Sequence, residues 1–240
     1  MNYMNEFKEH TAPGFEYRKP YWLREEIPVA DELMSYAPKL LHEFLRYHSD
    51  FVVGNASKLT PYVSQLYDPL VVRKKLDAWL TQAVKYTKED SDIFQNNTDT
   101  ELFQKHFPTA AALVKKFGDD CPIALYSVLN KQSVIERHTG FENKEAKYVR
   151  IHIPLFVPPG DIFFECEGLE IDWSDIWAFD NQLIHSAHNY TNNRRLAFII
   201  DLSRESLGLE PGKPWDKKRQ DEWPPFVRGK YPKVLHTKQK

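Results

Sequence analysis

The spacing of apolar residues along the chain changes near residue 120. Before that point, apolar side chains recur every three or four residues in the segments 29–48, 68–87 and 107–118, which predicts three amphipathic helices. The helix over 107–118 has Thr109 as a possible N-cap and Gly118 as its C-cap. The apolar stripe of each helix, the row of apolar side chains along one face, carries no cluster of metal-binding or acid–base residues. We therefore expect these helices to pack against the rest of the protein. The stripes of the first two helices are Leu33, Tyr36, Leu40, Leu41, Phe44 and Leu45, and Leu70, Val71, Leu76, Trp79, Leu80 and Val84.

After residue 120 the apolar residues mostly alternate with polar ones, in short segments rich in aromatic and β-branched side chains. Turn residues separate these segments at Pro158-Pro159-Gly160, Gly168 and Asn192-Asn193. Several short strands at this spacing favour a β-sandwich or barrel, and we expect a mainly β protein with a double-stranded β-helix (jelly-roll or cupin-like) core. The predicted strand segments are 123–129, 148–157, 161–173, 175–180 and 195–203.

These patterns predict one folded unit in three parts. Residues 1–120 form a helical N-terminal region that packs on the core, and residues 121–205 form the jelly-roll core. Residues 206–240 form a C-terminal extension, whose proline and charged residues indicate a segment lying over the surface.

Composition narrows the class of protein further. A hydrophobic content of 42% with six tryptophans indicates a folded chain, and a formal net charge of -2 gives no basic field for nucleic acid. The only two cysteines, Cys121 and Cys166, make no disulfide framework and favour a reducing compartment. No apolar run reaches the ~18 residues of a spanning helix, and the N-terminus has no apolar signal-like stretch. We expect a soluble, cytoplasmic protein without a membrane partner.

The segment "VRIHIP" places two polar side chains on one face of a predicted strand. Because alternate residues of a strand point to the same side, Arg150 and His152 share a face, opposite Val149, Ile151 and Ile153. If the apolar set packs between sheets, the polar face is either exposed to solvent or lines the mouth of a barrel. The pattern of the strand leaves both alternatives open.

A further arginine stands at the start of an apolar segment. Arg195 leads into "LAFIIDL", and a guanidinium buried there needs an anion, because an unpaired buried charge is very costly. Its partner could be Asp180, Asp201 or a bound ligand, and a carboxylate would suit its forked donors best.

Histidines at several positions suggest a metal site. His138 and His185 could bind a transition metal, and two histidines with one carboxylate are typical of non-haem iron oxygenases. Gly140, however, stands two residues after His138, where that carboxylate would be expected. His185 and His188 also form H-x-x-H, but without a cysteine pair or an H-E-x-x-H motif a zinc site is disfavoured.

Four segments together resemble the aspartyl/asparaginyl β-hydroxylase family of iron(II)- and 2-oxoglutarate-dependent oxygenases. They are "YSVLNKQSVIERHTG", "RIH", "FDNQLIH" and "RRLAFIIDL", in the order and spacing of the family, within about residues 124–203. The resemblance implies a jelly-roll fold, and Fe(II) and 2-oxoglutarate as cofactor and co-substrate. The substrate it implies is a small amino acid, an amino-acid derivative or a peptidyl residue, which is hydroxylated by O₂ at an unactivated carbon.

The resemblance also implies roles for individual residues. His138 and His185 would be the iron ligands. Arg195 and Ser127 would hold the distal carboxylate of 2-oxoglutarate, and His152 would contact its metal-bound end. Arg150 would face an acidic substrate. A cation beside a hydroxyl also suits the far end of a dicarboxylate on physical grounds.

Gly140 leaves a choice of reaction. The animal β-hydroxylases of the family resemble this chain in having "HTG", which favours hydroxylation. The alternative is a 2-oxoglutarate-dependent halogenase, in which glycine or alanine at this position lets chloride bind. Glu142 could supply a carboxylate, although its offset from His138 is unusual. A second alternative is a non-catalytic jelly-roll binding module, which would need none of Ser127, His138, His152, His185 and Arg195 together.

Overall fold

The computed structural model describes residues 21–48, 60–61, 79–85, 101–140, 143, 145–212 and 233–234. Its helices are α2 (Ala30–Tyr47), α3 (Glu101–His106) and α4 (Pro108–Phe117), with short 3₁₀ turns at Arg24–Glu26 and Gly118–Asp120. Its strands are β1 (Tyr21–Leu23), β2 (Thr60–Pro61), β3 (Trp79–Lys85), β4 (Ile123–Leu129), β5 (Ser133–His138), β6 (Tyr148–Phe156), β7 (Ile162–Cys166), β8 (Leu169–Ile171), β9 (Trp177–Phe179), β10 (His185–Asn189), β11 (Arg195–Ser203) and β12 (Lys233–Val234).

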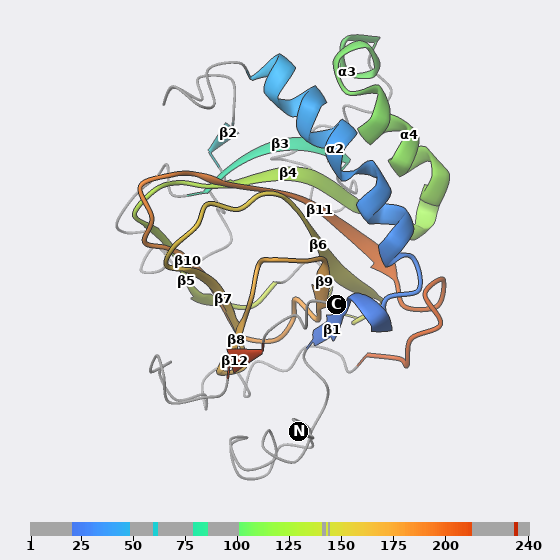
Figure 1. Ribbon diagram of the computed structural model, residues 1–240. Coiled ribbons are helices and arrows are strands. Elements are labelled where there is room, and N and C mark those ends of the chain that lie inside the picture. Colours follow the sequence, from blue (N-terminus) through green and yellow to red (C-terminus); the bar gives the residue numbers. More distant parts are fainter. Residues whose placement is uncertain are drawn as a thin grey trace.

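The strands form two sheets, which confirms the predicted mainly β jelly-roll fold. The larger sheet has the order β1-β9-β6-β11-β4-β3-β2, and the smaller one the order β12-β8-β7-β10-β5. All neighbouring strands described pair antiparallel except β12 and β8. Figure 1 shows the two sheets facing each other and the helices on the far side of the larger sheet.

Helix α2 covers the outer face of the larger sheet, as predicted. Its buried Leu33, Leu40 and Phe44 belong to the same apolar core as Ile151 and Ile153 of β6. The apolar face of β6 therefore lies under the helices and not between the sheets. Its other face carries Arg150 and His152, which are buried and line a pocket together with residues of the smaller sheet.

Helix α4 is also confirmed, but its N-terminus is capped differently from the prediction. Thr109 lies inside the first turn, and the backbone N–H groups of Thr109 and Ala110 donate to the carboxylate of Glu43 at 2.7 and 3.3 Å. Glu43 comes from α2, so a side chain from the neighbouring helix satisfies donors that no residue of α4 reaches. Gly118 ends the helix at φ +53°, as predicted.

The helix predicted over 68–87 is wrong where the structure describes it. Residues 79–85 form strand β3, paired with β4, and residues 68–78 and 86–87 lie outside the described residues. The error has a physical cause: positions four apart share a face in a helix and also in a strand. Leu80 and Val84 meet this condition and both lie in the core beneath the helices.

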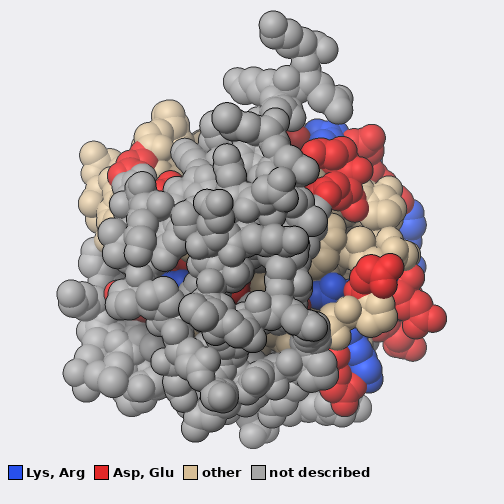
Figure 2. Space-filling model, turned by 90° about the horizontal axis from the view of Figure 1, so that it is seen from below, with Lys and Arg blue, Asp and Glu red and all other residues tan. Residues whose placement is uncertain are grey.

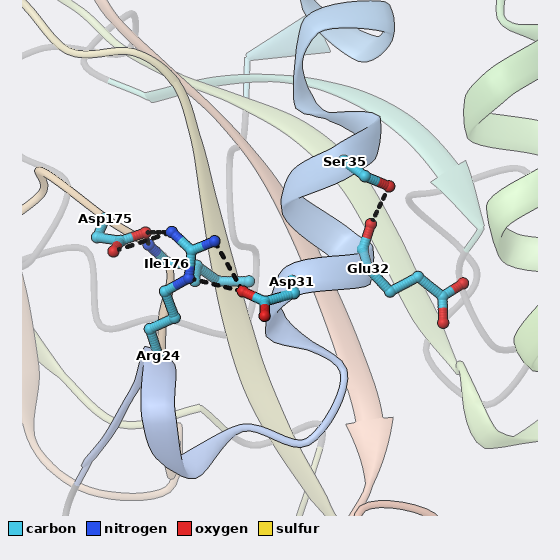
Figure 3. Close-up of polar contacts among 6 residues, drawn as sticks. All are labelled: Arg24, Asp31, Glu32, Ser35, Asp175 and Ile176. Atoms are coloured by element: carbon cyan, nitrogen blue, oxygen red, sulfur yellow. Dashed lines mark hydrogen bonds and ion pairs between the residues drawn. The ribbon is translucent and has the colours of Figure 1, made fainter. Parts of the chain in front are cut away.

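The first 120 residues therefore contribute to the sheet as well as to the helical layer. Besides β3, the short strand β1 extends the larger sheet at β9. Arg24, just after β1, links the edge of the larger sheet to α2. Its guanidinium forms ion pairs with Asp31 of α2 at 2.7 Å and with Asp175 at 3.2 Å (Figure 3). Such partly exposed pairs contribute about 0–1 kcal/mol each, so apolar packing is the main force holding the layers together.

The described surface, the two cysteines and the described helices show no further functional feature. Described acidic and basic side chains are interspersed on the face seen in Figure 2. Cys121 and Cys166 are buried free thiols. Among the described helices, none has the length and apolar character needed to cross a membrane.

Candidate active site

The six residues predicted for the site line a single pocket between the sheets. The pocket encloses about 420 Å³ of empty space, part of which is open to solvent. The predicted residues among its lining are Ser127, His138, Arg150, His152, His185 and Arg195. They come from β4, β5, β6, β10 and β11, so both sheets contribute. The pocket is otherwise lined by Trp79, Ile135, Phe164, Phe179, Ala187 and Ile199.

His138 and His185 are cross-strand neighbours in the smaller sheet. β5 and β10 run antiparallel with these two residues in register, and a bulge follows His185 in β10. Their ring centroids lie 4.2 Å apart and the rings are tilted by 56°. The two side chains therefore lie close enough to bind one metal ion.

Backbone carbonyls fix the protonation of both rings. Nδ1 of His138 lies 2.7 Å from the carbonyl oxygen of Glu136, and Nδ1 of His185 lies 2.7 Å from that of Leu183. A carbonyl oxygen can only accept, so each Nδ1 carries a hydrogen, and in the neutral form of such a ring the lone pair is on Nε2. Burial lowers the pKa of His185 well below its usual value, which keeps the ring neutral as metal binding requires.

His188 does not join them. Three residues further along β10, its side chain faces the other side of the sheet and its ring stacks on Phe163 at 4.4 Å. Its Nε2 contacts the hydroxyl of Ser186 at 2.9 Å. The H-x-x-H spacing is therefore not a metal-binding pair here.

Arg195 is a buried cation with no carboxylate partner among the described residues. It is 1% exposed, and its Nη1 donates only to the carbonyl and hydroxyl oxygens of Ser127, at 3.2 and 3.3 Å. Its Nε has no hydrogen-bond partner among these residues, and the guanidinium lies 4.2 Å from the ring of Trp173. Burial lowers the pKa of Arg195 to about 9. The fold thus maintains a desolvated positive charge in the lining of the pocket, suited to an anionic ligand.

The two protein carboxylates considered as partners of Arg195 are engaged elsewhere. Asp201 accepts from Nε and Nη2 of Arg150, both at 2.8 Å, as its direct cross-strand neighbour. Asp180 accepts from Arg204 at 2.9 Å. Of the three possibilities raised by the sequence, a bound ligand is the one that the structure leaves for Arg195.

Ser127 can donate to the same ligand. Its oxygen accepts from Nε1 of Trp79 at 2.8 Å and from Arg195, so these contacts leave its own hydroxyl hydrogen unused. Trp79 was not predicted as a site residue, because its segment was interpreted as a helix. The alternation of Trp79 and Thr81 with Leu80 could have indicated a strand.

His152 adds a further unpaired donor to the pocket. Both ring nitrogens are buried and have no hydrogen-bond partner in the described part of the chain, and the ring stacks on Trp177 at 4.4 Å. Burial, and then the charges of Arg195 and Arg150, lower the pKa of His152 well below its usual value. A neutral ring has one N–H to donate, and a carboxylate in the pocket could accept it.

No third protein ligand is found beside the two histidines within the part of the chain that the structure describes. Among the residues that the structure describes, no group of three His, Cys, Asp or Glu side chains could hold a metal ion. Gly140 has no room for a side chain, since a Cβ there would lie 2.8 Å from Nδ2 of Asn181. Glu142, the possible substitute, lies outside the described residues.

The side chains of the pocket fit iron and 2-oxoglutarate. Two imidazoles whose Nδ1 atoms face backbone carbonyls can offer Nε2 to a divalent transition metal and leave positions for other ligands. The unpaired guanidinium, hydroxyl and imidazole suit the carboxylates of a dicarboxylic acid.

Comparison with known proteins agrees with this chemistry. The family model described as aspartyl/asparaginyl beta-hydroxylase matches residues 72–205. The chain is therefore a member of the aspartyl/asparaginyl β-hydroxylase family, an iron(II)- and 2-oxoglutarate-dependent oxygenase whose cofactors are Fe(II) and 2-oxoglutarate. No curated protein sequence matches the chain.

Solved structures resemble the chain only distantly. A prolyl hydroxylase of Trichoplax adhaerens, in complex with a hypoxia inducible factor peptide, has a TM-score of 0.42 and 11% identity, over 72% of this chain and 80% of that one. A prolyl-4-hydroxylase of Pseudomonas putida has a TM-score of 0.40 and 10% identity, over 77% and 92%. The epimerase SnoN from nogalamycin biosynthesis has a TM-score of 0.36 and 11% identity, over 75% and 87%.

Proposed function

We propose that this protein hydroxylates an unactivated carbon of a small amino acid, an amino-acid derivative or a peptidyl residue. The observation that supports this most is Arg195, a buried guanidinium without a carboxylate partner in the pocket that also holds His138 and His185. A fold keeps such a charge at a cost only where a ligand neutralises it. A dicarboxylate that reaches from the histidines to Arg195 would do so.

Each residue then has a distinct task. His138 and His185 hold the iron through Nε2, with their rings oriented by the carbonyls of Glu136 and Leu183. Arg195 and Ser127 bind the distal carboxylate of 2-oxoglutarate, and His152 donates to the end nearer the metal. When bound, iron and 2-oxoglutarate activate O₂, with 2-oxoglutarate oxidised to succinate and CO₂ and one oxygen atom transferred to the substrate.

Arg150 is the proposed contact to the substrate. Asp201 holds its guanidinium through two hydrogen bonds and balances its charge. A balanced arginine attracts a carboxylate less strongly than an isolated one. We therefore propose a substrate group that is polar or weakly acidic at this position, and a small molecule in preference to a large acidic partner.

The experiment is turnover of 2-oxoglutarate. Purified protein with Fe(II), ascorbate and O₂ should convert 2-oxoglutarate to succinate, and a screen of amino acids and peptides should find a product heavier by one oxygen atom. His185→Ala is the matched inactive control. Absence of succinate formation in the presence of bound iron would favour the binding-module alternative.

The halogenase alternative depends on why residue 140 is glycine. The close approach of Asn181 gives that glycine a packing reason, independent of any halide. Hydroxylation therefore remains our proposal. Incorporation of chlorine in preference to oxygen, with the true substrate and chloride present, would refute it.

A further inference from the structure

Glu165 is a fully buried carboxylate on the face of the smaller sheet opposite the pocket. Its neighbour Phe164 lines the pocket, and successive residues of a strand point to opposite faces, so Glu165 of β7 points away from the pocket. Its exposed fraction is 0%. Keeping a carboxylate in such a position is costly unless donors surround it, so the groups that it binds indicate its role.

Three donors contact Glu165. Its Oε1 accepts from Nη2 of Arg137 at 3.1 Å and from the N–H of Gly168 at 2.6 Å, and its Oε2 accepts from the hydroxyl of Ser186 at 3.0 Å. Burial raises the pKa of Glu165, and these three donors act in the opposite direction. Since β7, β10 and β5 lie side by side in that order, the carboxylate reaches from β7 across β10 to β5.

Two of these partners are the chain neighbours of the predicted metal ligands. Arg137 directly precedes His138 in β5, and Ser186 directly follows His185 in β10. The two histidines line the pocket, whereas Arg137 and Ser186 bind Glu165 on the opposite face of the sheet. One carboxylate therefore holds both strands immediately beside the two imidazoles.

The pairing of β5 and β10 is irregular at the same place. Two residues of β5, Glu136 and Arg137, lie opposite the single Ser186 of β10. A bulge of this kind locally interrupts the backbone hydrogen bonds between the strands. The carbonyl of Glu136, which accepts from Nδ1 of His138, belongs to the bulge. The orientation of the His138 ring therefore depends on a part of the backbone that strand pairing alone does not fix.

We propose that Glu165 is a positioning residue for the metal site, which sets the relative position of His138 and His185 by binding Arg137 and Ser186 at the bulge. It acts through these neighbours, since Glu165 itself is not among the residues that line the pocket. Groups that orient metal-binding imidazoles in this indirect way typically contribute about 10- to 100-fold to metal affinity. The inference rests on the proposed function, because it assumes a metal at the two histidines.

The test is a Co(II) titration of the full-length protein without 2-oxoglutarate, with the visible ligand-field spectrum as a second readout. Glu165→Gln keeps the shape but replaces an accepting oxygen with a donor, and Ser186→Ala removes one of the three contacts. Because Ser186 also contacts Nε2 of His188, His188→Ala separates that contact from the one to Glu165. Glu43→Gln is the matched control, since Glu43 is a buried carboxylate that accepts from two N–H groups but lies on α2.

Glu165→Gln should bind Co(II) about 10- to 100-fold more weakly than the wild type, with a changed spectrum, because the two imidazoles no longer keep one fixed geometry. Ser186→Ala should fall at the lower end of this range, about tenfold, because two of the three contacts remain. The double variant should bind no more weakly than Glu165→Gln alone, since both changes remove the same contact. His188→Ala and Glu43→Gln should bind Co(II) as the wild type does, although thermal unfolding should show Glu43→Gln to be less stable.

Either of two results would overturn the inference. A folded Glu165→Gln protein with the Co(II) affinity and spectrum of the wild type would make Glu165 a structural ion-pair partner only. An equal loss of Co(II) affinity in Glu43→Gln would make the effect a consequence of lower stability. If Glu165→Gln does not fold, Ser186→Ala decides by the same criteria.

Failure of the wild type to bind Co(II) is a different result. It refutes the proposed function and, with it, the inference. Binding of Co(II) by the wild type together with unchanged binding by both Glu165→Gln and Ser186→Ala refutes the inference alone and leaves the proposed function standing.

Discussion

Replacing Arg195 with methionine should weaken the binding of 2-oxoglutarate but should not lower the stability of the ligand-free protein. Burial lowers the pKa of Arg195 from 12.5 to about 9, which at about 1.4 kcal/mol per pKa unit corresponds to a cost on the order of 5 kcal/mol for keeping the charge in the ligand-free fold. Methionine fills similar space without that charge. It also loses the contacts to Trp173 and Ser127, worth roughly 1–2 kcal/mol together.

The expected net effect of Arg195→Met is unchanged or increased stability without ligand, by up to about 3 kcal/mol. For a chain of this length, that corresponds to a rise in Tm of up to roughly 6–12 °C. At the same time, 2-oxoglutarate should bind at least about tenfold more weakly, because a charge-assisted contact worth about 1.5–3 kcal/mol is lost. Thermal unfolding with and without ligand measures the first quantity, and calorimetric titration measures the second.

Arg204→Met is the matched control. Arg204 is also buried, but Asp180 balances its charge at 2.9 Å. Its replacement removes the cation that balances a buried carboxylate and should destabilise the fold by about 3–5 kcal/mol. If Arg195→Met destabilised the ligand-free protein to the same extent and left 2-oxoglutarate affinity unchanged, Arg195 would be a structural residue and our reasoning would be refuted.

Three further predictions concern the metal, pH and Gly140. His185→Ala should abolish Co(II) binding, whereas His188→Ala, on the other side of the same strand, should retain it; equal loss in both, measured by metal titration, would contradict the two-histidine site. The affinity for 2-oxoglutarate should stay level from pH 7 to 8 and fall about tenfold per pH unit above about 9, since Arg195 carries its charge below its pKa and loses it above; a flat titration to pH 10 would show that the charge is not needed. Gly140→Ala should lower the free energy of unfolding by about 1–3 kcal/mol through its clash with Asn181, and Asn181→Ala in the same chain should recover part of that loss; denaturant unfolding of the single and double variants measures this coupling, and strict additivity would argue against the clash.

The sequence alone predicted the segments that form β4, β6, β7, β8, β9 and β11, but neither β5 nor β10, which carry His138 and His185. Alternation of apolar and polar residues is a local property, so β4, β6 and β11 could be predicted from their own residues. Resemblance to the family then brought together Ser127, His138, His152, His185 and Arg195. Their functional roles remain predictions, but the pocket that contains all of them was not visible in any one segment.

Tertiary structure decided what local pattern leaves ambiguous. Leu80 and Val84, four residues apart, satisfy a helix and a strand equally, and only pairing with β4 made their segment a strand and brought Trp79 to Ser127. The sequence also left open which layer each face of β6 contacts. The structure shows that Ile151 packs under α2 and not between the sheets.

The pairing of strands distant in sequence also decided which charged side chains form ion pairs. Asp201 was as good a partner for Arg195 as for Arg150 until the register of β6 and β11 placed it opposite Arg150. The reason for glycine at position 140 is visible only in the folded chain, where a Cβ at that position would lie 2.8 Å from Nδ2 of Asn181. Contacts between residues some forty to fifty positions apart depend on the register and packing of whole strands, which no local window of sequence contains.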